Sequence, residues 1–521
     1  MKKETIRKLG ILEDRVREVG QGYFNTTTLA SVTDKRFASG EEVQLVFDYN
    51  LKNLLLLGAV RETPVLMTGR SDAGKTDLAT IVMTALFGGE DTKLEDGKEV
   101  VEKEAGFYKL DVDNDLDEDS FMDPDLSKMG KAKLSEVLQP PKWINRSKGV
   151  ILDEGNRIDP KIAAKIMRML DREKVMRLKA GIEIKLGVPY ESEDGSIKRY
   201  FWPVMCINEG ANYTGTFDMD FAAKRRATME IPMDEAIPQA TDVMDIIEGR
   251  DGNLSLKNGE EHFQDVLDVM QDLDNIELDT MAQMYLSYLS NMEKCVKRKK
   301  GIKGDDFDKS YCDKEGCHIQ KHTKGMCGAT RGFTEGLIIN LKKAARGFAG
   351  MRALKAVQKA QDYLENQEDE ELEKTLQAFS ETKYQGEQLA KEFVNNYISN
   401  LEVIPEDIQA AVPFVGYSKL QVAEGWIKKN PDFDGSKWEA LKYIADKTLQ
   451  NLNTFTLKFK DELNVYFMRT QGQDINLTEE QKDRLEKHFE QYDPWMKDTL
   501  AAFASSEDNK SYRQAVDNLL D

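Results

Sequence analysis

The sequence predicts an α/β protein with a sheet flanked by helices and a helical C-terminal region. Three observations support this prediction. Between about residues 46 and 235, short apolar runs alternate with helical patterns. Polar or turn residues end each of four apolar runs, which read ETPVLMTG, GFYKLDV, KGVILDE and FWPVMCI. From about residue 361 onward, nearly all of the sequence has the residue spacing of amphipathic helices.

The chain of 521 residues is too long for one hydrophobic core, so several domains are expected. Changes in sequence pattern divide it into four segments. These are an N-terminal segment at 1–45, the α/β core at 46–235, a helical segment at 236–360 and an all-helical region at 361–521. The third segment contains a polar, cysteine-rich insert at 295–328.

The composition is that of a water-soluble protein, with 40% hydrophobic and 32% charged residues. A net charge of −20 argues against a broad nucleic-acid surface, because phosphate backbones are bound mainly by basic patches. The longest aliphatic run, Leu54 to Leu57, is too short to span a membrane. Five cysteines without an export signal favour a reducing compartment, so a cytoplasmic location is expected.

The first apolar run leads into GRSDAGKT, which matches the phosphate-loop pattern G-x-x-x-x-G-K-[ST]. A strand pattern enters this loop and a helical pattern leaves it. Glycines let backbone amides turn towards phosphate oxygens, and a helix N-terminus favours negative charge. The lysine would reach the β- and γ-phosphates of ATP, and the threonine hydroxyl would bind Mg²⁺. The predicted nucleotide-binding residues are Gly69, Asp72, Gly74, Lys75, Thr76 and Asp77.

A second motif, GVILDE, is an apolar strand that ends in two acidic residues, Asp153 and Glu154. Asp153 would hold Mg²⁺ through its water shell, and Glu154 would orient and polarise the attacking water. The alternative interpretation is a solvent-exposed turn with no catalytic role, which could also contain two acidic residues. The phosphate-loop pattern earlier in the chain favours the catalytic interpretation.

Two later segments carry a family resemblance. Two runs, ILDEGNRIDPKIAAKIMRMLDREKVMRL and FWPVMCINEGANYTGTFDMDFAAKRR, resemble the MoxR-like group of AAA+ ATPases. The second run is also similar to the related CbbQ-like and NorQ-like activators and to the cobalt-chelatase ATPase subunit. The resemblance covers residues 60–235 strongly and 236–360 weakly, and it does not extend to the C-terminal third. It implies an AAA+ P-loop core of αβα type with a helical lid.

The resemblance also implies roles for residues after the second acidic motif. Asn208 matches the sensor-1 position, and Arg331 resembles the sensor-2 arginine that opens a lid helix. Arg225 matches the arginine finger, with Arg226 as the alternative. The pair Glu209–Gly210 departs from the family, which usually has a proline after the asparagine, and lysine–arginine replaces the usual aspartate–arginine. The choice of finger therefore stays open.

An arginine finger acts on the nucleotide of a neighbouring subunit, which requires a head-to-tail interface. The resemblance implies a hexameric ring that uses ATP to remodel a protein client, with a separate partner bearing a von Willebrand A domain. The region 361–521 would dock the client or partner. The alternatives are the ATPase subunit of a metal chelatase, a nucleic-acid-stimulated motor and a nucleotide-gated scaffold.

The cysteine-rich insert contains evenly spaced metal-ligating residues in the pattern C-x₄-C-x₄-H-x₄-C. Three thiolates and one imidazole form a ligand set that suits structural zinc. The surrounding residues are too polar to form a hydrophobic core. A reduced loop without metal is the alternative. The predicted ligands are Cys312, Cys317, His322 and Cys327. The basic run KCVKRKKGIKG precedes them and is the main support for the nucleic-acid alternative.

One further element is predicted between the acidic motif and Asn208. Asp194–Gly195 lies between two alternating segments, which is a β-hairpin signal.

Overall fold

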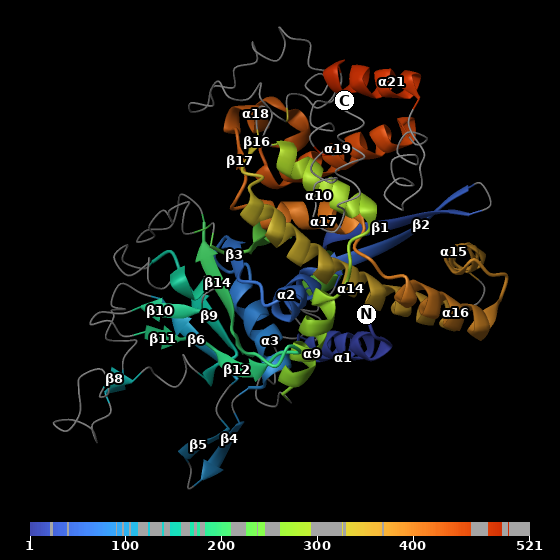
Figure 1. Cartoon of the computed structure of the whole chain (residues 1–521). Coiled ribbons are helices and arrows are strands. Elements are labelled where there is room, and N and C mark those ends of the chain that lie inside the picture. The colour runs from blue at the N-terminus through green and yellow to red at the C-terminus, as the bar shows by residue number, and fades with distance from the viewer. Residues whose placement is uncertain are drawn as a thin grey trace. The chain divides into compact units, whose positions relative to one another are not determined.

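The computed structural model describes residues 1–20, 24, 26–38, 41–89, 91–95, 98–103, 106–112, 123–124, 138–139, 146–157, 167–170, 174–177, 183–209, 224, 226–236, 238–244, 261–292, 326, 330–366, 369–459, 478–491 and 499. Internal contacts divide the chain into two compact units. Unit 1 combines Met1–Ile276 with Arg346–Leu401, and unit 2 combines Glu277–Ala345 with Glu402–Asp521. Figure 1 shows the helices and strands of both units.

A five-stranded parallel sheet forms the centre of unit 1. Its spatial order is β15 (Met229–Pro232), β3 (Val65–Gly69), β14 (Trp202–Asn208), β9 (Gly149–Asp153) and β6 (Phe107–Asp111). The four predicted apolar runs form β3, β6, β9 and β14, so their prediction as strands is confirmed. Because all strands are parallel, their carboxyl ends share one edge, where ligands bind in open α/β sheets.

Both faces of the central strands are covered, as expected for a parallel sheet. All residues of β3 are buried, and β9 and β14 are buried except at their last residue. Alternate residues on one face join a cluster with residues from the segment 169–186, and on these strands they are Leu66, Val150, Leu152, Met205 and Ile207. The edge strand β6 is half exposed.

Helices of unit 1 pack on the sheet and on one another (Figure 1). Helix α3 contacts β6, β9 and β14, and it is covered in turn by α1, α2 and α9. The first half of unit 1 contains α1 (Lys3–Gly20), α2 (Leu51–Val60), α3 (Lys75–Phe87) and α9 (Phe263–Asp274). The later stretch contains the end of α14 (Glu335–Glu365), with α15 (Glu370–Ser380) and α16 (Gly386–Ser399).

Short antiparallel pairs complete unit 1. They are β1 (Thr28–Ala38) with β2 (Glu41–Asn50), β4 (Asp91–Glu95) with β5 (Lys98–Lys103), β7 (Asp123–Pro124) with β8 (Leu138–Gln139), β10 (Val175–Arg177) with β11 (Glu183–Lys185), and β12 (Val188–Glu191) with β13 (Ile197–Tyr200). The last pair is the predicted hairpin, and Gly195 turns it with a φ of 75°. Single helical turns occur at η3 (Met167–Leu170) and η5 (Met233–Glu235).

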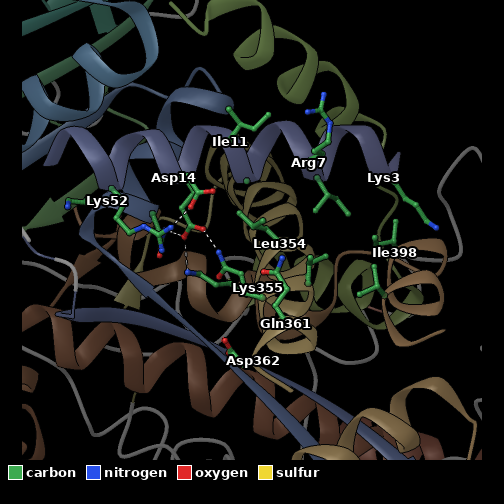
Figure 2. Close-up of a pocket in the computed structure, with 18 of the residues that line it drawn as sticks. Lys3, Arg7, Ile11, Asp14, Lys52, Leu354, Lys355, Gln361, Asp362 and Ile398 are labelled. Atoms are coloured by element: carbon green, nitrogen blue, oxygen red, sulfur yellow. Dashed lines mark hydrogen bonds and ion pairs between the residues drawn. The ribbon is translucent and has the colours of Figure 1, made fainter. Parts of the chain in front are cut away.

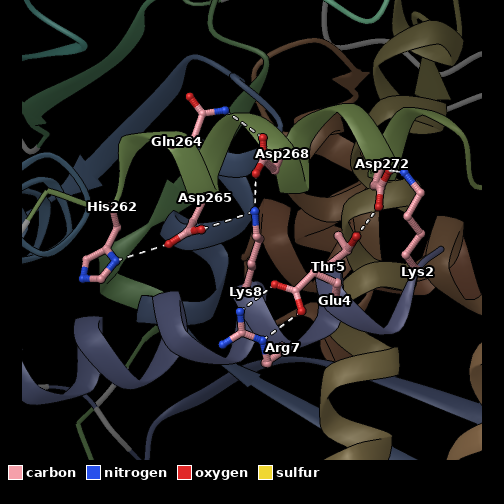
Figure 3. Close-up of polar contacts among 10 residues, drawn as sticks. All are labelled: Lys2, Glu4, Thr5, Arg7, Lys8, His262, Gln264, Asp265, Asp268 and Asp272. Atoms are coloured by element: carbon pink, nitrogen blue, oxygen red, sulfur yellow. Dashed lines mark hydrogen bonds and ion pairs between the residues drawn. The ribbon is translucent and has the colours of Figure 1, made fainter.

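Charged residues fix α1 against α9 (Figure 3). Lys8 of α1 pairs with Asp265 at 3.6 Å and also contacts Asp268. Lys2, just before α1, pairs with Asp272 at 3.3 Å. The apolar face of α1 includes the buried residue Leu9 and packs on its neighbours. Helix α1 is therefore an integral layer of unit 1, in contact with the helix that leaves the phosphate-loop motif.

A cleft of about 900 Å³ lies between α1, α14 and α16 (Figure 2). Glu13 of α1 accepts hydrogen bonds there from Asn53 at 2.6 Å, Lys355 at 2.8 Å and Gln358 at 2.5 Å. Burial alone would raise the pKa of Glu13. The charge of Lys355 and the three hydrogen bonds outweigh burial, so this pKa lies below its ordinary value of 4.5. Glu13 thereby joins α1 to α2 and α14.

Replacing Glu13 with glutamine is expected to lower the free energy of unfolding by about 2 kcal/mol at pH 7, since a partly buried ion pair loses one partner. The lowered pKa means that this stability is present above pH 4.5 and is lost as the pH falls through the lowered value. Urea unfolding at several pH values measures the difference. Glu18→Gln is the control with little effect, because the Glu18 side chain, which pairs with Arg15, is 65% exposed. Equal stability of Glu13→Gln and wild type at pH 7 would contradict the expectation.

Unit 2 is mostly helical and includes the chain from Glu402 onward. Its elements are α10 (Thr280–Met292), β16 (Thr330–Arg331), the start of α14, α17 (Pro405–Gly416), β17 (Gln421–Val422), α18 (Glu424–Lys429), η7 (Pro431–Phe433), α19 (Lys437–Lys458) and α21 (Glu479–Gln491). Tyr285 of α10 donates a hydrogen bond at 2.9 Å to the carbonyl of Ala445 on α19. Among the described helices, none has the length and apolar character needed to cross a membrane.

Candidate functional site

The turn from β3 into α3 has the backbone geometry of a phosphate-binding loop. Gly69 ends the strand with a φ of 143°, Asp72 has a φ of 64°, and Gly74 precedes the helix with a φ of 74°. A Cβ atom on Gly69 would lie 3.2 Å from both Met233 Cβ and Asp234 Oδ1. The N-cap residue of α3 is Gly74, which has no side chain to cap the first turn. Its first amides are thus available to an anion at the carboxyl edge of the sheet.

Lys75 points back into this loop. Its Nζ donates hydrogen bonds to the carbonyl oxygens of Gly69 at 3.1 Å and Arg70 at 2.5 Å. The residue is only 6% exposed, and burial lowers its pKa below the ordinary value of 10.5. A buried ammonium is costly unless it is paired, which is why its presence here points to an anionic ligand.

Thr76 and Asp153 meet at this edge although they are far apart in sequence. The Thr76 hydroxyl donates to Asp153 Oδ1 at 2.8 Å, and the backbone N–H of Glu154 donates to the same oxygen at 3.0 Å. A hydroxyl and a carboxylate are the hard oxygen donors that Mg²⁺ prefers, so these two residues fit the ion. The carboxylate reaches the first turn of α3 because β9 ends at the same edge as β3.

Glu154 follows Asp153 in a left-handed conformation, with a φ of 52°. Such a φ is uncommon for a residue with a side chain, and it occurs in tight turns, helix caps and functional sites. The carboxylate is 39% exposed and pairs with Arg157 at 3.1 Å. It is thus directed away from the core and is accessible to water.

Asn208 ends β14, which lies between β3 and β9, and its register partner is Gly69. The side chain of Asn156 donates a hydrogen bond at 2.7 Å to the Asn208 carbonyl. The strand order places Asn208 between the phosphate loop and the acidic pair. Cys206 lies on the same strand, and burial raises its pKa to about 12, so this thiol stays neutral.

Sequence analysis missed a basic residue at this edge. Lys109 Nζ lies 3.3 Å from Asp153 Oδ2 and 3.3 Å from Asp111 Oδ1. Burial acts against the charged form, but the hydrogen bond to Asp111 and the charge of Asp153 raise the pKa of Lys109 above 10.5. The available signal was the alternation in GFYKLDV, which puts Lys109 and Asp111 on one face of the strand.

Other predicted site residues lie elsewhere or outside the described residues. Arg226 lies two residues before Thr228. The backbone N–H of Thr228 donates a hydrogen bond at 2.9 Å to the carbonyl of Pro64, which lies just before the amino end of β3. Arg226 is therefore separated from its own phosphate loop by the length of β3, about 13 Å. Asp72 and Asp77 lie in the loop and the first turn of α3, and both are exposed. Arg225 is outside the described residues.

Arg331 lies in unit 2, where β16 pairs with β17 and Arg331 is the register partner of Gln421. Its sensor-2 role stays a prediction. The predicted zinc ligands, Cys312, Cys317, His322 and Cys327, fall outside the described residues. In the described part of the chain, no group of three or more His, Cys, Asp or Glu is placed to hold a metal.

Comparison with known proteins adds a structural likeness. The chain is similar to the crystal structure of a predicted ATPase from Cytophaga hutchinsonii, with a TM-score of 0.43 and 12% identity over 78% of this chain and 88% of that chain. No protein-family model and no curated protein matches the sequence. A likeness this distant has no bearing on function, so the function is inferred from the geometry of the site.

Proposed function

We propose that this protein is a Mg²⁺-dependent ATPase of the AAA+, MoxR-like type. The observation that carries the proposal is the 2.8 Å hydrogen bond between Thr76 and Asp153, which joins the phosphate-loop motif to the acidic strand. A phosphate loop with a buried lysine and an acidic strand end at the same edge is the arrangement that P-loop enzymes use to hydrolyse nucleoside triphosphates.

Each residue has a definite role in this proposal. Lys75 and the first amides of α3 bind the β- and γ-phosphates, and Thr76 and Asp153 hold Mg²⁺. Bound Mg²⁺ neutralises the charge that develops on the phosphates. Glu154 accepts a proton from water as the water oxygen attacks the γ-phosphorus, and the bond from that phosphorus to the ADP oxygen breaks. Asn208 orients the γ-phosphate and the water.

We further propose that the protein works as a homo-oligomeric ring, a hexamer as the MoxR-like resemblance implies, and remodels a protein client. The position of Arg226 supports this proposal, because an arginine at the amino end of β3 is remote from its own phosphate loop. From that end of the sheet, Arg226 or its neighbour Arg225 would act on the nucleotide of an adjacent copy. A site completed by a second copy requires a head-to-tail interface, which closes into a ring or extends as a filament.

The proposed function is tested with the purified chain. Phosphate release from ATP should require Mg²⁺ and fall to background in EDTA. Turnover per chain should rise with protein concentration, because each site is completed by a neighbour. Sedimentation velocity with a non-hydrolysable ATP analogue measures assembly over the same concentrations. Assembled protein that releases no phosphate from Mg²⁺–ATP would overturn the ATPase, and turnover independent of concentration in a monomer would overturn the ring.

A further inference from the structure

Three charged side chains, those of Lys109, Asp111 and Asp153, lie close together next to the proposed nucleotide site. Lys109 and Asp111 are two residues apart on β6, so their side chains point to the same face. Asp111 is the register partner of Asp153 across the β6–β9 ladder. Two carboxylates directly opposite each other on neighbouring strands repel. The Lys109 ammonium lies 3.3 Å from each of them and offsets that repulsion.

We propose that Lys109 is a resident counter-cation of Asp153 that competes with Mg²⁺ for this carboxylate. The inference rests on the proposed function, because it takes Asp153 as the residue that holds Mg²⁺. Lys109 would be a positioning residue, acting on the metal site through Asp153 and making no contact with ATP.

The hydrogen bonds of Asp153 support this role. Its Oδ1 accepts from the Thr76 hydroxyl and the Glu154 amide, and its Oδ2 is held by Lys109. Both oxygens of the carboxylate therefore already have donors. A divalent cation that approaches this carboxylate without nucleotide meets the positive charge of Lys109 a few ångströms away, and like charges at that distance repel.

Asp111 gives Lys109 a second partner. Because the ammonium already lies 3.3 Å from Asp111, it keeps a carboxylate partner when Asp153 turns to the metal. The triphosphate brings additional negative charge, so Mg²⁺ that arrives with ATP overcomes the competition whereas Mg²⁺ alone does not. Lys109 thus couples metal binding to nucleotide binding.

The first test measures metal binding without nucleotide. Mn²⁺ serves as the probe because it takes the same oxygen ligands as Mg²⁺. Lys109→Met removes the charge and keeps much of the side-chain length, and the dissociation constant for Mn²⁺ should fall about tenfold relative to wild type. Electron paramagnetic resonance of free Mn²⁺ gives the constant. Lys109→Arg keeps the charge and should bind Mn²⁺ as the wild type does.

A matched control is Lys35→Met. Lys35 is also 45% exposed and pairs with Glu42 at 3.1 Å, but it lies on the β1–β2 hairpin. Its Mn²⁺ constant should not change. An unchanged constant in Lys109→Met, or an equal change in Lys35→Met, would overturn the proposal.

A second variant is expected to change the affinity for Mn²⁺ in the opposite direction. Asp111→Asn removes the alternative partner of Lys109, so the ammonium should hold Asp153 more firmly and Mn²⁺ should bind more weakly than to wild type. Tighter binding by Asp111→Asn would overturn the proposal. None of these measurements requires ATP hydrolysis. Tighter Mn²⁺ binding by Lys109→Met in a protein without ATPase activity would therefore uphold the role of Lys109 and reject only the proposed function.

Discussion

Glu154→Gln is expected to lower ATP turnover by about a hundredfold or more and to leave ATP binding intact. Glutamine has nearly the same shape as glutamate but cannot accept a proton from the attacking water. Among the described residues, the Glu154 carboxylate pairs with Arg157 and not with the loop residues that bind phosphate in our proposal. Binding and chemistry should thus separate in this variant.

Single-turnover phosphate release measures the chemical step, and a fluorescent ATP analogue measures binding. Glu183→Gln is a suitable control, because Glu183 also pairs with an arginine, Arg177, at 2.8 Å but lies on β11, outside the parallel sheet. Its turnover should equal that of the wild type. Wild-type turnover in Glu154→Gln would show that another group activates the water. The ATP-bound variant is also the best form for capturing a client.

The core strands could be predicted because they satisfy a strong local rule. Parallel strands buried on both faces are continuous apolar runs, and β3, β9 and β14 are such runs bounded by polar residues. The phosphate loop could also be predicted, because its glycines, lysine and threonine have a fixed spacing. The loop and Asp153 then lie at the same edge of the sheet, because β3, β14 and β9 are parallel.

The N-terminal helix α1 was not predicted from the sequence. Its buried residues Ile6, Leu9, Leu12 and Val16 do have helical spacing, but polar residues dominate between them. Lys109 was missed for a different reason. Its role depends on the register between β6 and β9, and the sequence of one strand contains no information about its partner.

The sequence pattern of a helix does not show which compact unit the helix belongs to. Helix α14 is one continuous pattern from Glu335 to Glu365, yet its two parts belong to different compact units. A helical period reports which face is apolar and not which neighbours cover that face. Contacts between segments far apart in sequence, such as Glu13 with Lys355, decide the unit boundaries.

Lys75→Ala is expected to weaken ATP binding by about a hundredfold or more. Two charge-assisted hydrogen bonds to phosphate oxygens contribute about 3 kcal/mol together, which corresponds to a factor of this size. The fold should tolerate the change, because the lowered pKa of Lys75 shows that burial disfavours its charged form. With a folded-state pKa below 10.5, the ammonium opposes folding at neutral pH, so its loss should not lower the unfolding midpoint through charge.

A loss of binding without a loss of stability distinguishes a ligand-binding lysine from a structural one. Calorimetric titration with ATP and Mg²⁺ measures the first quantity, and thermal unfolding without nucleotide measures the second. Lys75→Met, which keeps the apolar stem, should behave like Lys75→Ala in binding. Lys52→Met is the matched control, since Lys52 is a buried lysine on α2 that is 4% exposed. If Lys75→Ala bound ATP as tightly as Lys52→Met, the loop would not be the phosphate site. The contact between Thr76 and Asp153 would then serve only to join α3 to β9.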